Sequence, residues 1–102
     1  MDRAKKAENN LELMVKESQA SAYEALQLYK SKCNRLKLKK DFLQAINIAA
    51  KGAICMLSNG YENAGAELST ILTQLLMESE LDITPDIRNI INDVDAGFAA
   101  LP

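Results

Sequence analysis

Residues 42–57 read FLQAINIAAKGAICML, and this stretch decides the fold. Its only strongly polar side chains are Gln44, Asn47 and Lys51, which recur at helical spacing and form one narrow polar stripe. A helix with so narrow a polar face is expected to be covered from both sides. That is the position of a central helix in a stack of antiparallel helix pairs, so the sequence predicts an all-α fold.

The central helix has a start signal and a stop signal. Asp41 can cap its first turn, and Gln44 three residues later completes a box-like pair. Asn59-Gly60 ends it, because glycine adopts the left-handed conformation that helix ends prefer. We therefore expect this helix to extend from Asp41 to Ser58.

Four further helices are predicted from the same kinds of signal. Ser21 and Glu24 have the spacing of a capping box, and Thr84-Pro85 places a capping residue before a proline at the first helical position. With a linker at residues 80–83, the predicted helices are Arg3 to Ser18, Ser21 to Lys40, Tyr61 to Ser79, and one that follows Thr84.

A weak repeat signal accompanies these helices. Tyr23-Glu and Tyr61-Glu each open a predicted helix, and their separation is close to the length of one helix-turn-helix repeat. We therefore expect residues 1–102 to form a single helical-repeat domain, an antiparallel helix-hairpin stack of about five helices, tetratricopeptide-like and part of an α-solenoid.

Composition and charge bound the function. The 102 residues are 48% apolar, which is enough for one modest core. Residues 1–40 hold ten Lys and Arg against five Asp and Glu, whereas residues 41–102 hold two against nine. The N-terminus lacks the apolar run of a signal peptide, and residues 42–57 are too short and too interrupted to cross a bilayer. We expect a cytoplasmic protein without direct membrane insertion.

No pattern in the chain indicates catalysis. Histidine is absent, and there is no phosphate loop, nucleophile elbow or metal-ligand spacing, so we expect no enzyme activity, cofactor or metal site. Cys33 and Cys55 occupy apolar helical positions and are expected to be reduced core thiols, with a redox or crosslinking role as the alternative.

Two kinds of binding remain open. Residues 30–40 hold six basic residues, which suits a nucleic-acid binder, but base-stacking aromatics are missing apart from Tyr29 and the acidic remainder would repel a polyanion. We therefore expect no nucleic-acid partner. A generic helical-repeat module for some other protein partner stays possible, because a fold does not determine a partner.

Residues 23–79 carry a family resemblance. They contain YEALQLYK, then a Lys-Gly-Ala step at residues 51–53, then NAGAEL at residues 63–68. In this order and without a gap, they resemble the N-terminal region of the Golgi-to-ER traffic protein four family, which acts in guided entry of tail-anchored proteins. The matched positions include Tyr23, Glu24, Ala25, Gln27, Tyr29, Arg35, Ala45, Gly52, Ala53, Ser58, Gly60, Asn63, Ala66, Leu68 and Ser69.

The resemblance implies an adaptor. In that family, the N-terminal helices dock onto the dimeric ATPase that targets tail-anchored proteins to the ER, favouring its nucleotide-bound form and restraining hydrolysis. The C-terminal half binds a ubiquitin-like partner and has no counterpart in these residues. We therefore expect this chain to be the N-terminal part of a longer protein.

Six residues are implied as contacts with the ATPase. Arg35 matches a family arginine, and Lys30 matches an arginine or lysine. Glu67 stands where the family has an aspartate associated with a regulatory contact, and Leu26 stands where it often has histidine. The expected partner-binding set is Tyr23, Leu26, Gln27, Lys30, Arg35 and Glu67, with a solvated helix face or core packing as the alternative for each.

Overall fold

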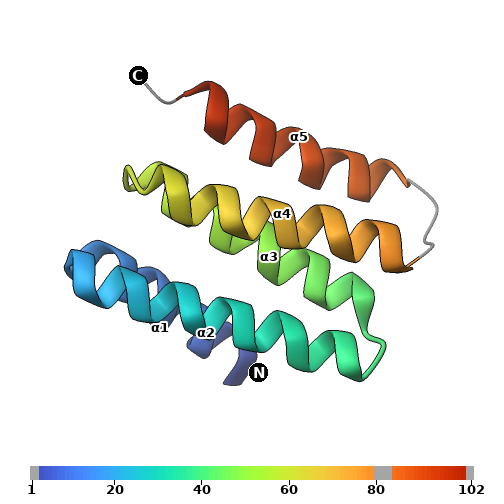
Figure 1. Cartoon of the computed structure of the whole chain (residues 1–102), viewed down its shortest axis with the longest axis horizontal. Helices are drawn as coiled ribbons and strands as arrows, with labels where there is room; N and C mark the ends of the chain where they lie inside the picture. The colour runs from blue at the N-terminus through green and yellow to red at the C-terminus, as the bar shows by residue number, and fades with distance from the viewer. Residues whose placement is uncertain (1–2, 80–83, 101–102) are drawn as a thin grey trace.

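The chain folds as a stack of five helices (Figure 1). The computed structural model describes residues 3–79 and 84–100, with side chains from residue 10 onward, so the predicted linker at residues 80–83 lies outside it. The helices are α1 (Arg3–Glu17), α2 (Gln19–Leu38), α3 (Phe42–Ser58), α4 (Glu62–Ser79) and α5 (Pro85–Ala99). The part of the chain that the structure describes contains no strand, and the all-α prediction is confirmed.

Helix α3 is the centre of the stack. It makes its most extensive contact with α4, then α2, and it also touches α5 and α1. Its predicted polar stripe is confirmed, because Gln44 and Lys51 are exposed and Asn47 is half-buried while most of the other faces are buried. In Figure 1, α1 and α3 lie behind α2 and α4. The shortest dimension of 22 Å is about two helix diameters, so these four helices form two layers.

Small residues let the helices approach closely. A Cβ on Gly52 of α3 would lie 2.9 Å from Cδ1 atoms of both Tyr29 and Leu68, which are themselves buried. A Cβ on Gly65 of α4 would lie 2.6 Å from Leu57. Ordinary carbon contacts are nearer 3.5–4.0 Å. Glycine at these two positions is therefore what allows α3 to sit directly against α2 and α4.

The turns after α2 and α3 have the same hydrogen bonds. After α3, Gly60 and Tyr61 donate their backbone N–H groups to the carbonyls of Leu57 and Met56. After α2, Lys40 and Asp41 do the same to Lys37 and Leu36. Both turns are Schellman motifs, in which the residue after the helix C-cap takes the left-handed conformation. Gly60 has φ 84°, as its type predicts, but the equivalent residue of the first turn is Lys40, with φ 62°.

Two of the predicted helix starts are confirmed and one is wrong. Asp41 accepts a hydrogen bond from the Gln44 N–H, and Thr84 accepts one from the Ile87 N–H. Helix α2, however, begins at Gln19 and not at Ser21. Its capping residue is Ser18, whose Oγ accepts from the Ser21 N–H at 3.0 Å, because only one residue separates α1 from α2.

The two Tyr-Glu sequences do not occupy equivalent positions. Tyr23 lies inside α2, in its second turn, whereas Tyr61 precedes α4. The resemblance between the two openings is therefore not a structural repeat. None of the helices, over the described residues, is long and apolar enough to cross a membrane.

Candidate docking surface

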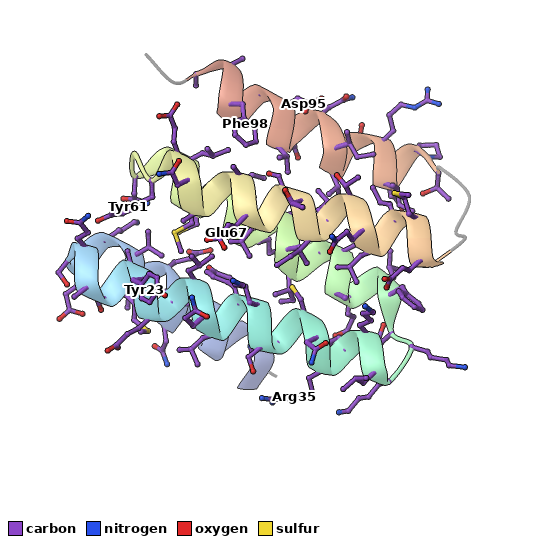
Figure 2. All side chains as sticks on the ribbon, viewed as in Figure 1. Tyr23, Arg35, Tyr61, Glu67, Asp95 and Phe98 are labelled. Atoms are coloured by element: carbon purple, nitrogen blue, oxygen red, sulfur yellow. The ribbon has the colours of Figure 1, made fainter. Side chains whose placement is uncertain are left out.

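A hollow opens between α2 and α4 at the end where both helices begin. Figure 2 labels three of its lining residues, Tyr23, Tyr61 and Glu67. Its volume is about 440 Å³. The Tyr23 side chain is 64% exposed at its rim, and half-buried Tyr61 lines it from the turn before α4. The lining residues are Gln19, Ala22, Tyr23, Leu26, Met56, Gly60, Tyr61, Glu62, Asn63, Ala64 and Glu67. Two aromatic rings and two carboxylates thus surround an apolar floor.

An ion pair crosses from α2 to α4 beside this hollow. The Lys30 Nζ lies 3.2 Å from Oε1 of Glu67, and both side chains are partly exposed. The two residues had been expected to face a partner separately, yet they face each other. Pairs of this exposure contribute about 0.2–1 kcal/mol, so a partner with suitable charges can separate them at little cost.

A second ion pair joins the same two helices further along. The Lys37 Nζ lies 2.8 Å from Oε2 of Glu78. Between the two pairs lies a smaller hollow of about 210 Å³, which is lined by Lys30, Cys33, Asn34, Lys37, Ile71, Gln74, Leu75 and Glu78. We call the surface formed by this hollow, the larger hollow and the two ion pairs the α2–α4 seam.

The structure gathers five of the six expected contact residues on or beside this seam. Tyr23, Leu26 and Glu67 line the larger hollow, and Lys30 lines the smaller one. Leu26 is only 3% exposed, so it forms the floor and offers a partner little surface. Gln27 is exposed on the same side of α2, less than one turn before Lys30.

Arg35 lies elsewhere. It lines a separate hollow of about 290 Å³ between α1 and α2, together with Asn10, Leu11, Met14, Leu28, Ser31 and Lys32. Figure 2 shows its side chain at the edge of the molecule away from Tyr23, Tyr61 and Glu67. Five residues along a helix rotate a side chain by about 140°, which places Arg35 and Lys30 on different faces.

Tyr61 is one of the eight lining residues that the expected set omitted, and it is the second aromatic ring of the hollow. Its sequence position directly after Gly60 indicates a turn, which does not by itself indicate a surface. It enters the hollow because the Schellman turn brings its N–H to Met56, another lining residue. Gly60 predicts the turn from the sequence. Whether Tyr61 then lines a hollow depends on how α2 packs beside that turn, which the sequence does not indicate.

The two thiols are unsuited to nucleophilic chemistry. Burial raises the pKa of Cys33 from 9.0 to about 11, and its Sγ lies 3.7 Å from the Ala45 carbonyl oxygen, to which it donates. Burial is also the main cause that raises the pKa of Cys55, assisted by Glu12 and opposed by Lys16 and by a hydrogen bond with Tyr29. Both thiols therefore stay protonated at neutral pH.

Among the described residues, no group of three or more histidine, cysteine, aspartate or glutamate side chains is placed to hold a metal ion. Comparison with protein-family models, with curated proteins and with solved structures finds no match. The α2–α4 seam is consequently characterised by its own geometry, as a protein surface that combines exposed aromatic area with paired charges.

Proposed function

We propose that this chain is the docking part of a helical adaptor and that it binds its partner through the α2–α4 seam. The observation that carries the proposal is the larger hollow, where Tyr23 and Tyr61 stand beside the Lys30–Glu67 pair. Exposed aromatic rings next to a pocket often dominate the energy of protein interfaces. The stack of helix hairpins supports a tetratricopeptide-like solenoid, whose grooves commonly bind proteins.

The partner we propose is the dimeric ATPase that targets tail-anchored proteins to the ER, met in the cytoplasm. The support is the ungapped resemblance of residues 23–79 to the Golgi-to-ER traffic protein four family. That resemblance also implies a ubiquitin-like partner, bound by a part of the family's proteins that these residues do not match. The role is regulatory docking, with no chemical step performed by this chain.

Docking would exchange one ion pair for two. In the unbound protein, Lys30 and Glu67 pair with each other. A partner that offers a carboxylate to Lys30 and an ammonium group to Glu67 would replace this contact with two new ion pairs. The exchange removes water from all four charges, so it strengthens the interaction only where the geometry is close. It therefore gives selectivity for a partner whose surface carries both charges in the right order.

Calorimetric titration into the ATPase, with and without ATP and at two salt concentrations, tests the proposal. We expect saturable binding that strengthens with ATP and weakens with salt. Tyr23→Ala should weaken it by roughly thirty-fold. Arg88→Glu on α5, which is exposed and away from the seam, is the matched control and should leave affinity unchanged.

The sharpest variant exchanges the charges of the seam. Lys30→Glu combined with Glu67→Lys keeps the internal ion pair but presents the opposite charges to a partner. We expect unchanged helicity by circular dichroism and a loss of binding of about ten-fold or more. Undiminished binding by this double variant would contradict docking through the seam, and Arg35→Glu would then test the α1–α2 hollow instead.

A generic interaction module is the second candidate, because the seam itself does not identify the ATPase. A folded chain that fails to bind the ATPase under every condition would support this candidate.

A further inference from the structure

Helices α2 and α4 end, and α3 begins, at the same end of the stack (Figure 1). Exposed apolar side chains gather there. Of the six large apolar side chains exposed among the described residues, three belong to this end: Leu38 at 74%, Leu43 at 51% and Met77 at 75%. The Lys37–Glu78 ion pair holds the last turns of α2 and α4 beside each other. Met77 therefore belongs to the turn of α4 that adjoins the turn carrying Leu38.

Two cations, Lys39 and Lys40, lie between Leu38 and Leu43 in the sequence. Lys39 and Lys40 are exposed, and neither forms an ion pair or a side-chain hydrogen bond with any residue between 10 and 79 or between 84 and 100. Two nearby carboxylates of the described residues have other partners, because Asp41 caps α3 and Glu78 binds Lys37. We call Leu38, Lys39, Lys40 and Leu43 the basic tip. It presents leucine and lysine together on the turn between α2 and α3.

The backbone at the basic tip is unfavourable for its sequence. Lys40 has φ 62° in a turn whose counterpart uses Gly60. The left-handed conformation destabilises the protein when a lysine adopts it, because its Cβ crowds the backbone, whereas glycine has no Cβ and no such penalty. A residue kept in such a conformation at an exposed turn points to a use for its side chain.

We propose that the basic tip binds the surface of membranes rich in anionic phospholipids. The exposed leucines enter the boundary between headgroups and acyl chains, and the lysines meet the lipid phosphates. The contact is peripheral and needs no spanning helix. It leaves Tyr23, near the other end of α2, open for the protein partner proposed above.

The chemistry of the tip favours lipid over nucleic acid. The aromatic ring in this region is Phe42, which is half-buried and packed against the core. No ring is therefore free to stack on a base, and exposed leucines contribute nothing to phosphate binding. Leucine beside lysine is instead the composition of amphipathic surfaces that lie at a membrane interface.

Vesicle flotation tests the proposal. We expect the chain to float with vesicles in which about one lipid in three is phosphatidylserine, to bind phosphatidylcholine vesicles weakly, and to dissociate at high salt. Each lysine should contribute about five-fold in affinity, so Lys39→Gln with Lys40→Gln should lose roughly twenty-five-fold. Lys16→Gln with Lys32→Gln gives the same net charge with the tip intact, and should change affinity less than about two-fold.

A fluorescent reporter tests the leucines directly. The chain contains no tryptophan, so Leu38→Trp introduces a single one at the tip. Its emission should shift to the blue with anionic vesicles, while Leu13→Trp, at an exposed position on α1, should not shift. Equal losses in the two lysine double variants, or no blue shift from Leu38→Trp, would overturn the proposal. So would tip-dependent binding to a single-stranded oligonucleotide without binding to vesicles.

Discussion

At the scale of single residues, Lys40 and Gly60 make a natural comparison, because they hold the same position in two turns with the same hydrogen bonds. We expect Lys40→Gly to raise the free energy of unfolding by about 1 kcal/mol, since glycine accepts the left-handed conformation without a steric cost. Urea denaturation measures the change. Lys39→Gly is the control, because Lys39 has φ −83° and gains nothing from glycine. A gain of equal size in the control would contradict the explanation.

Cys33 makes stability depend on alkaline pH. Its pKa is raised to about 11 by burial, whereas the unfolded thiol ionises near 9. The stability that comes from keeping the thiol neutral is fully present below pH 9 and is lost as the pH rises toward 11. We expect a fall of up to about 3 kcal/mol over that range.

Thermal unfolding of the native chain and of Cys33→Ala, followed across this pH range, measures that effect. The variant retains every lysine and tyrosine, so the part of the fall that it lacks belongs to Cys33. Identical slopes in the two proteins would show that the thiol does not contribute. At pH 8, Ellman's reagent should react with half-buried Cys55 well before Cys33.

At the scale of helices, Ser18 and Ser21 separate two ways of starting α2. Ser18 Oγ accepts the Ser21 N–H, while Ser21 Oγ donates to a Glu17 carboxylate at 3.3 Å in an exposed contact. We expect Ser18→Ala to cost about 1 kcal/mol of stability, and Ser21→Ala clearly less. Chemical denaturation of the two variants measures both costs. The reverse order would restore the start at Ser21 that the local sequence predicts.

Helix bounds were predicted correctly where a short segment of sequence determines them. The bounds of α3, the Asp41 and Thr84 caps and the stop at Gly60 were predicted, because periodicity and capping are properties of short segments. The start of α2 was wrong, since two serines competed for one role. The left-handed Lys40 had no signal, because lysine is rarely found there.

The candidate site was predictable only in part, for a different reason. Tyr23, Lys30 and Glu67 were singled out by resemblance to a family, and their meeting across two helices depends on packing. No sequence pattern sets the alignment of α2 against α4, so neither the Lys30–Glu67 pair nor the hollow was foreseen. The separation of Arg35 from Lys30 follows from helix geometry and could have been predicted.

At the scale of the whole molecule, α3 is expected to be the most protected element. Over the described residues it packs against each of the other four helices, so its amides open only when much of the stack unfolds. Native-state hydrogen exchange should therefore find the slowest amides in α3. The amides of α1, which has fewer neighbours, should exchange considerably faster. Equal protection of the α1 and α3 amides from hydrogen exchange would contradict the conclusion that α3 is the centre of the stack.

The small residues of α3 bear on whether the chain adopts a single alignment of its helices. Ala45, Ala49, Ala50 and Ala53 are buried on α3, and side chains this short give a neighbouring helix few ridges that fix its position along the axis. The lysine–glutamate pairs of the seam favour one alignment, because both pairs would be broken if α2 were displaced along α4 by a turn. They thus act against misaligned folds more than they strengthen the correct one. Replacing Lys30 and Lys37 with Met should leave the melting temperature nearly unchanged but broaden the amide NMR spectrum, as alternative alignments become populated.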